Sequence, residues 1–359
     1  GGKDPPRRGS RQGEGVLKAM QNFMRSWGRA RVMGFGLVAT VVAAVAIAPG
    51  ASSARTASGK GKHLSIAYLS FAVQNSYDAP MLAAAKKVAD AHNASLTVFD
   101  ANNSPTTQYS QFQDVIAKGG YQGIITQPIE ATNLIPLVHQ AVAKHIKVVN
   151  IDQVMGPSLS TAKVQVKGLS GNVSFVPTTM GRDLGTLTVK ACKAGHFNPC
   201  NVGYLYDIQA SALDVAINRG FSAAIKGSPV KVVATGQDFF TPAQGLTAVQ
   251  NMLTSNSSIN VIAGSDQGIE GAVQATGGKH VLLVGYGGSA AGIVGVKSGK
   301  WFGTIEQDPA TEGKVGMETL INAIRTGSKA PGINPLNNAP NGGVITKANA
   351  KLFTGEWPG

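Results

Sequence analysis

The sequence is poor in charge, in cysteine and in aromatic residues, and it contains only one long apolar run. Charged residues make up 14% of the 359 residues, against about 25% in ordinary globular proteins. Its two cysteines are too few for a disulfide-dense scaffold or a four-cysteine zinc site. A single apolar run excludes a multi-span transporter. The hydrophobic share of 43% is too high for a disordered chain, so we expect globular domains with ordinary hydrophobic cores.

The apolar run, Val32–Ala48, has the features of an export signal. A basic segment, Met24–Arg31, precedes it, and the small residues Ser52 and Ala54 follow it as a cleavage site would require. We therefore expect residues 1–54 to be a leader with a signal peptide that starts at Met24. The protein would then be exported to the periplasm or the extracytoplasmic face, without a lipid anchor because the leader has no cysteine. An uncleaved membrane anchor is the alternative.

The positive charge of the chain is concentrated in its leader. The formal net charge is +13, and residues 1–54 carry eight of the 32 basic residues but only two of the 19 acidic ones. The basic residues of the remaining chain are scattered, with no run beyond Lys60–Lys62. Nucleic-acid-binding proteins cluster Lys and Arg on one face or helix, so we expect no nucleic-acid partner.

Export changes the interpretation of the two cysteines, Cys192 and Cys200. In an oxidising compartment two cysteines most simply form a disulfide, and here it would close a small loop. A redox pair or a metal site is the alternative. These residues lack the C-x-x-C spacing of a redox pair, and His196 is the one histidine nearby. We therefore predict a disulfide and no metal site.

Strand and helix patterns alternate along the body of the chain. The alternation stops near residues 158–171, which are rich in Ser and Gly, and then resumes. This order is typical of parallel sheets with helices on both faces, and it predicts an α/β protein of two doubly wound domains. A late segment, Val344–Ile345, looks like a crossing or edge segment. The predicted strands are Leu64–Phe71, Ser95–Phe99, Gly123–Thr126, Lys147–Ile151, Val202–Tyr206, Lys231–Ala234, Val261–Gly264, Val281–Gly285 and Phe302–Glu306.

Residues that follow these strands are candidates for a binding site, because ligands bind at the carboxyl ends of parallel strands. Most are amides, hydroxyls, carboxylates and aromatic residues. Such a set suits a polyhydroxylated neutral ligand, since polar groups bond its hydroxyls and aromatic faces cover its C–H surfaces. The same residue types are common in turns and at helix N-caps. That alternative stays open at each position.

Several of these stretches together resemble type I periplasmic substrate-binding proteins of the ribose-binding type, which feed ABC transporters. The resemblance covers about residues 63–350 and implies two lobes joined by a multi-strand hinge, with a ligand cleft between them. It implies a first lobe of residues 63–165 plus about 308–335, and a second lobe of residues 166–307 plus about 336–359. The stretches are Ile66–Leu82, Ile151–Gln153, Asp214–Ile225, Gln237–Leu253, Asn260–Ala275, Val281–Gly288 and Gly299–Pro309.

The resemblance also implies ligand-binding residues, some of which depart from the family pattern. Gln153 stands where the family has an Arg, and Gly287 where it has an Asp. Asp78 replaces a common second aromatic, and Val215, with Asp214 adjacent, stands near the position of another Arg. The charged clamp of the ribose type is thus largely missing, so we expect a small neutral sugar, deoxy-sugar or polyol instead. The expected ligand-binding residues are Ser70, Asn75, Tyr77, Asp78, Asp152, Gln153, Asp214, Phe240 (or Phe239), Ser265, Asp266 and Gln307.

Other classes of protein are less consistent with the residues. The segment Gly285–Ala290 matches G-x-G-x-x-A, but no acidic residue follows at the spacing of a dinucleotide site. No G-x-S-x-G motif of a hydrolase is present. Sugar-responsive repressors of the LacI type share the sheet pattern but begin with a helix-turn-helix, and a ligand-presenting partner of a chemoreceptor is a further alternative. We expect a monomer without cofactor or catalysis that passes its ligand to an ABC transporter permease.

Overall fold

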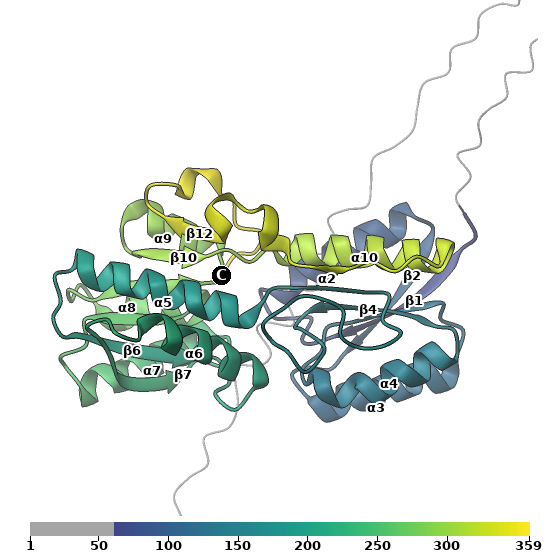
Figure 1. The fold of residues 1–359 in the computed structure, drawn as a ribbon, viewed down its shortest axis with the longest axis horizontal. Coiled ribbons are helices and arrows are strands. Elements are labelled where there is room, and N and C mark those ends of the chain that lie inside the picture. Colours follow the sequence, from purple (N-terminus) through teal and green to yellow (C-terminus); the bar gives the residue numbers. More distant parts are fainter. Residues whose placement is uncertain (1–60) are drawn as a thin grey trace, which may run out of the picture. The chain divides into compact units, whose positions relative to one another are not determined.

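A computed structural model describes residues 61–359, which form two six-stranded sheets with helices on both faces (Figure 1). The predicted leader, its start at Met24 and its cleavage site lie outside the described residues. The structure confirms the predicted fold class, two doubly wound α/β domains. Within residues 61–359, no helix combines the length and the apolar character needed to cross a membrane.

The first sheet has the strand order β11-β5-β4-β3-β1-β2, and all its pairs are parallel. Figure 1 shows helices α2 and α10 on one of its faces and α3 and α4 on the other. We call this sheet and its helices the first lobe. Its strands are β1 (Leu64–Ser70), β2 (Ala94–Asp100), β3 (Gly123–Thr126), β4 (Lys147–Asp152), β5 (Gly171–Ser174) and β11 (Gly332–Ile333), and its helices are α2 (Asp78–Ala91), α3 (Pro105–Lys118), α4 (Ala131–Ala143) and α10 (Pro309–Thr326).

The second sheet has the order β12-β10-β9-β8-β6-β7, and only its edge strand β12 is antiparallel. We call this sheet and its helices the second lobe. Its strands are β6 (Cys200–Tyr206), β7 (Val230–Gln237), β8 (Val261–Ser265), β9 (Leu282–Tyr286), β10 (Gly303–Ile305) and β12 (Val344–Thr346). Its helices are α5 (Pro177–Ala194), α6 (Ala212–Ile225), α7 (Pro242–Ser255), α8 (Asp266–Thr276) and α9 (Ala290–Ser298), with short 3-10 turns at Pro335–Asn338, Pro340–Gly343 and Ala350–Leu352.

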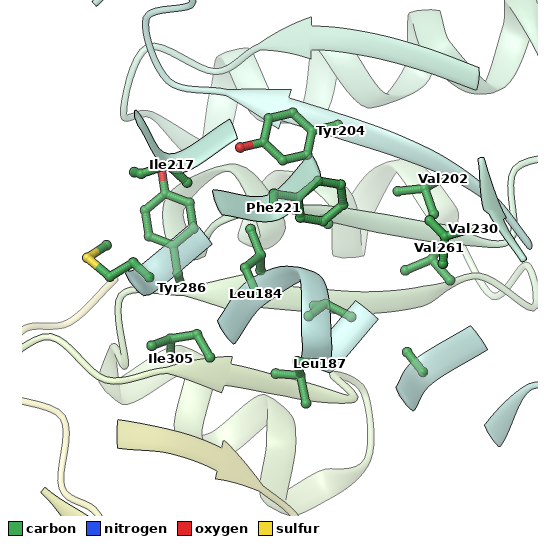
Figure 2. Packing of buried hydrophobic residues seen from close by; sticks show 14 of the residues in the cluster. Leu184, Leu187, Val202, Tyr204, Ile217, Phe221, Val230, Val261, Tyr286 and Ile305 are labelled. Carbon is green, nitrogen blue, oxygen red and sulfur yellow. The ribbon is translucent and has the colours of Figure 1, made fainter. Parts of the chain in front are cut away.

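Helices cover both faces of each sheet, and successive side chains of a strand point to opposite faces, so the central strands are buried on both sides. In β1, Ala67 and Leu69 belong to one hydrophobic cluster, whereas Ile66 and Tyr68 belong to the other. The second lobe repeats this arrangement, and Figure 2 shows one of its clusters, where Leu184 of α5 packs close to Phe221 of α6. These near-continuous apolar strands are typical of parallel sheets covered by helices.

The chain crosses between the sheets at three places. It leaves the first sheet after β5, returns after β10 to form α10 and β11, and leaves again toward β12. The predicted first crossing, at residues 165/166, is therefore too early, because β5 pairs with β4 in the first sheet. The sequence of β5 is Gly-Asn-Val-Ser, which has no apolar run to indicate a strand. Buried Asn172 supports it instead, since its side chain bonds Asn150, Ala162 and Ser174.

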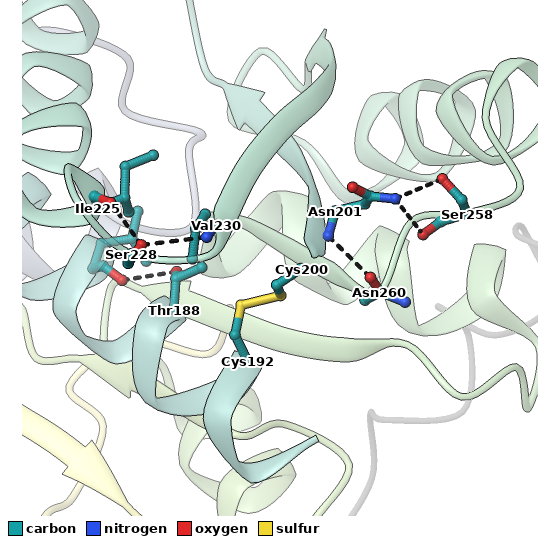
Figure 3. Close-up of a disulfide and its surroundings, with 10 residues drawn as sticks. Thr188, Cys192, Cys200, Asn201, Ile225, Ser228, Val230, Ser258 and Asn260 are labelled. Atoms are coloured by element: carbon teal, nitrogen blue, oxygen red, sulfur yellow. Dashed lines mark hydrogen bonds between the residues drawn. A yellow bond between two sulfur atoms is a disulfide. The ribbon is translucent and has the colours of Figure 1, made fainter. Parts of the chain in front are cut away.

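A disulfide joins Cys192 in the last turn of α5 to Cys200 at the start of β6, as predicted (Figure 3). Both cysteines are fully buried in the hydrophobic cluster of the second lobe. The bond lies at the amino end of β6. It is therefore at the end of the sheet opposite the carboxyl ends of the strands, where parallel sheets bind ligands.

Candidate functional site

A pocket lies between the carboxyl ends of the strands of the two sheets. The empty space between its lining residues is about 690 Å³ and includes open solvent at its mouth. Both lobes contribute to its lining. The lining residues are Phe71, Asn75, Tyr77, Asp78, Asp152 and Gln153 from the first lobe, and Phe175, Pro177, Met180, Leu213, Ile217, Phe240, Ser265, Gln267, Tyr286, Gln307 and Trp357 from the second lobe and the connecting segments.

Most of the predicted ligand-binding residues meet in this pocket. Eight of them line it: Asn75, Tyr77, Asp78, Asp152, Gln153, Phe240, Ser265 and Gln307. They come from loops far apart in the sequence, which the parallel topology brings to the same edge of each sheet. The pocket therefore combines carboxylates, amides and aromatic rings, as the strand-end residues indicate.

Two carboxylates of the first lobe face the pocket and share one donor. The side-chain amide of buried Gln127 donates to Asp78 at 2.5 Å and to Asp152 at 3.3 Å. The side-chain carbonyl of Gln127 in turn accepts from the backbone N–H of Phe71 at 3.2 Å. Gln127 follows β3 and anchors the loop after β1 beside both acids. No Lys or Arg is among the residues that line the pocket.

Burial makes these carboxylates weak acids. Loss of solvation raises the pKa of Asp152 from 3.8 to about 7, although the Gln127 bond lowers it in part. Burial, and next the nearby charge of Asp152, raises the pKa of Asp78 well above its usual value. Buried Glu312 on α10 also has a raised pKa, first from burial and then from Asp152. A protonated carboxyl can donate to a ligand oxygen and an ionised one can accept from a ligand hydroxyl, so these groups suit hydroxylated ligands.

Aromatic rings from both lobes form the apolar walls. Phe71 and Phe240 make an edge-to-face contact with centroids 6.4 Å apart, and Tyr77 and Trp357 make another at 5.4 Å. Sequence reasoning missed Phe71 and Trp357, as well as the other apolar lining residues. Phe71 directly follows a strand, which was a usable signal. Trp357 lies in the last residues of the chain, where no pattern indicated a site.

Two adjacent phenylalanines after β7 have different positions. Phe239 and Phe240 both have positive φ, 50° and 55°, a backbone conformation that bulky residues rarely adopt. Phe240 lines the pocket, whereas Phe239 is 50% exposed. Asp152, at the end of β4, also has positive φ, 69°. Such strained residues concentrate at ligand sites, where the surrounding structure holds them in place.

Direct contacts join the lobes at the pocket. The side-chain amide of Gln267 on α8 donates to the Ser76 hydroxyl at 3.1 Å and to the Asn75 side-chain oxygen at 3.5 Å. The same Asn75 oxygen accepts from the backbone N–H of Tyr77 at 2.8 Å and so shapes the loop after β1. Asn75 therefore positions this loop and also lines the pocket.

Three predicted ligand-binding residues are not among the residues that line the pocket, and their roles in ligand binding stay predictions. Ser70 is fully buried at the end of β1. The carboxylate of Asp214 accepts from the backbone N–H groups of Asp207 and Ile208, at 3.0 and 2.8 Å, and so fixes the loop after β6. Asp266 is enclosed by donors from two neighbouring segments: it accepts from the Ser289 backbone and hydroxyl, each at 2.8 Å, and from the Thr304 hydroxyl at 2.6 Å.

Ser265 lines the pocket and also caps a helix, which is the alternative that the sequence left open. Its hydroxyl caps α8 by accepting from the Gly268 N–H at 3.2 Å and donates to Asp238 at 3.1 Å. The hydroxyl is thus engaged within its own lobe. Among residues 61–359, no group of three or more His, Cys, Asp or Glu side chains could hold a metal ion.

The fold and the pocket define a two-lobed α/β protein with a polar and aromatic ligand site between parallel sheets. Residues 66–329 match the family model described as "Periplasmic binding protein domain". The chain belongs to this family, and the match confirms the resemblance inferred from the sequence.

Proteins with similar sequence and structure agree with this assignment. The ribose import binding protein RbsB of Escherichia coli is 27% identical over 293 residues, which cover 80% of this chain and 92% of that protein. The xylitol-binding protein of Mycolicibacterium smegmatis is 27% identical over 235 residues, 64% of this chain and 63% of that one. The crystal structure of the Caulobacter myo-inositol binding protein has a TM-score of 0.70 at 19% identity, covering 82% of this chain and 97% of that one.

Proposed function

We propose that this protein is an extracytoplasmic solute-binding protein that captures a small neutral sugar, deoxy-sugar or polyol and delivers it to the permease of an ABC importer. The observation that carries the proposal is the pocket itself. Asp78, Asp152 and Gln307 line it together with aromatic residues, at the junction of two lobes. The proposal includes no catalytic step and treats the protein as a monomer outside the cytoplasmic membrane, without a lipid anchor.

Relatives support the class of ligand. The relatives include a ribose import binding protein and a xylitol-binding protein. A sugar and a linear polyol share vicinal hydroxyl groups, and these are the groups that carboxylates and amides recognise. The shared chemistry therefore favours a hydroxylated ligand for this chain as well.

Charge in the pocket supports a ligand without negative charge. Asp78 and Asp152 face the pocket, and no Lys or Arg lines it. A sugar phosphate or sugar acid would bring its negative charge into a buried site without a compensating cation, which is costly. The net positive charge of the chain lies elsewhere and does not offset this cost.

Aromatic walls support a compact ligand with exposed C–H faces. Tyr77 and Phe240 stand on different lobes and both line the pocket. Rings of this kind cover the apolar face of a sugar while hydrogen bonds hold its rim. A deoxy-sugar has more apolar surface per hydroxyl than a hexose, which matches the aromatic lining of this pocket.

A ligand panel tests the proposal. Thermal shift and calorimetry on the exported protein would compare D-ribose, D-allose, xylitol and myo-inositol with ribose 5-phosphate and gluconate. We expect at least one neutral compound to bind, with a smaller radius of gyration in X-ray scattering at saturation, because the two lobes close on the ligand. Binding of the anions alone, or a radius of gyration unchanged by a saturating ligand, would contradict the proposal.

A further inference from the structure

The last five residues of the sequence, Gly355–Gly359, contact both lobes; we call them the strap. The side chain of Glu356 reaches the first lobe. Its carboxylate accepts from the backbone N–H of Thr311 at 2.8 Å and from the Thr311 hydroxyl at 2.6 Å. Thr311 lies in the first turn of α10, where a negative charge also interacts favourably with the helix dipole.

The next two residues of the strap bind the second lobe. The backbone N–H groups of Ala290 and Ala291, in the first turn of α9, donate to the carbonyls of Trp357 and Pro358 at 2.9 and 3.0 Å. The indole N–H of Trp357 donates to the carbonyl of Gly287 at 2.7 Å. Consecutive residues thus hold different lobes, and the strap crosses from one to the other.

Trp357 is tightly enclosed by this arrangement. Its side chain is only 4% exposed. Gly287 has φ +137°, and a Cβ added there would lie 2.7 Å from the indole ring. A side chain at residue 287 would therefore displace the ring, so this glycine makes room for Trp357.

The indole ring also faces the ligand pocket and the first lobe. Trp357 lines the pocket and packs edge-to-face on Tyr77, which precedes α2. The Tyr77 hydroxyl bonds Glu312 at 3.4 Å, one residue from Thr311, which holds the strap. The ring is therefore part of the wall of the site, and its position depends on contacts with both lobes.

We propose that Trp357 is a ligand-contacting, specificity-determining residue, and that the Glu356–Thr311 contact latches it in place when the lobes close. This inference rests on the proposed function for its ligand, but the latch itself does not. Breaking the Glu356 contact frees the strap, withdraws the ring from the pocket wall and opens a path for ligand release. Glu356 does not line the pocket, so its effect on binding comes through Trp357.

Hydrogen exchange tests the latch without a ligand. In Glu356→Ala, exchange of the Ala290 and Ala291 amides should rise at least tenfold, although these amides are in the other lobe from Thr311. The matched control is Glu318→Ala, which removes the same charge from an exposed position on α10. Unchanged exchange at Ala290 and Ala291 would overturn the latch, because the strap would then be held by the second lobe alone.

Ligand kinetics test the role of Trp357. With the compound of D-ribose, D-allose, xylitol and myo-inositol that binds wild type best, Glu356→Ala should release the ligand about tenfold faster, with little change in association. Trp357→Phe should weaken binding less than Trp357→Ala, and Trp357→Ala should change the order of affinity among the four compounds. An unchanged order would overturn the specificity role. Failure of wild type to bind any of the four would contradict the proposed function, while the exchange measurement would still decide the latch.

Discussion

The two lobes place acidic residues at equivalent points, the carboxyl ends of their strands, and use them differently. Asp152 at the end of β4 has one side-chain donor, Gln127, and faces the pocket. Asp266, directly after β8, is fully buried and bonded to Ser289 and Thr304. A strand-end position thus brings an acid to the edge of the sheet, and the donors on neighbouring segments decide whether it is available to a ligand.

The same difference extends to other acids of the second lobe. Asp207 accepts a bond from the Tyr286 hydroxyl, and Asp238 accepts from the Ser265 hydroxyl. Asp214 holds the loop after β6. The second lobe therefore uses its carboxylates to fix its own loops and offers the ligand mainly aromatic and amide groups. The first lobe supplies the acidic side of the site.

Among these variants, replacing Asp266 should lower the free energy of unfolding most. Asp266→Ala leaves the Ser289 N–H and two hydroxyls without an acceptor, and each buried group left unsatisfied costs about 1–3 kcal/mol. We expect the free energy of unfolding to fall by about 3–5 kcal/mol in urea denaturation. Asp266→Asn keeps an acceptor and should lose less. A variant that stays as stable as wild type but binds ligand weakly would show that Asp266 belongs to the site after all.

Removing the disulfide should destabilise the second lobe and spare the site. The bond closes a loop with a sequence separation of eight residues, which stabilises by about 2.5 kcal/mol in the chain-entropy model. The double variant Cys192→Ala, Cys200→Ala should lose about this much in denaturation, with ligand affinity unchanged. Reduced wild type is the matched control. A loss of affinity in the folded variant would be incompatible with a bond at the end of the sheet away from the pocket.

Replacing Asp152 should affect binding instead of folding. A hydrogen bond to a charged group contributes about 1.5–3 kcal/mol, so Asp152→Ala should weaken binding by roughly ten- to a hundredfold in calorimetry. Asp152→Asn should weaken it less, and it also suits the positive φ of this residue. Asp114→Ala, an exposed acid on α3, is the control for charge. Wild-type affinity in Asp152→Ala would remove this residue from the site.

The strands with apolar sequences were predictable from the sequence, whereas the polar strand β5 and the two-residue strand β11 were not. The nine predicted strands coincide with β1–β4 and β6–β10. In the central strands the apolar residues are buried on both faces of the sheet, whereas the edge strands β2 and β7 are largely exposed or half-buried. β5 escaped prediction because the hydrogen bonds of Asn172 support it more than apolar residues do. β11, a pair of residues between Pro331 and Asn334, has no periodicity to detect.

Pocket-lining residues were predictable where their position after a strand is enough to bring them to the pocket, as for Asp152 and Phe240. The availability of an acid to the ligand was not predictable where a hydrogen-bond donor distant in the sequence determines it. The hydroxyl of Thr304 donates to the carboxylate of Asp266, although the two residues are 38 positions apart in the sequence. No local pattern links them. Trp357 lines the pocket from the strap, which hydrogen bonds of Glu356 with Thr311 and of Trp357 with Ala290 hold. Such contacts exist only in the folded chain.

The pH dependence of stability should distinguish the buried acids of the two lobes. Burial raises the pKa of Asp152 to about 7 and that of Asp266 to about 6, from 3.8 in each case. The folded state therefore binds more protons than the unfolded state in these windows, and the free energy of unfolding falls as pH rises. The contribution of each acid is fully present below about pH 4. For Asp266 it is lost as pH rises through about 6, and for Asp152 through about 7.

Two variants separate these contributions in urea denaturation between pH 4 and 8. Asp152→Asn should flatten the curve up to about pH 7, whereas Asp266→Asn should flatten it only up to about pH 6. Between those values the Asp266→Asn curve should keep the slope of wild type, because Asp152 still titrates there. Asp114→Ala, the exposed control, should leave the whole curve unchanged in slope. If Asp152→Asn has the wild-type slope between pH 6 and 7, its carboxyl is already ionised in the folded protein, and the acidic side of the pocket is better solvated than its burial implies.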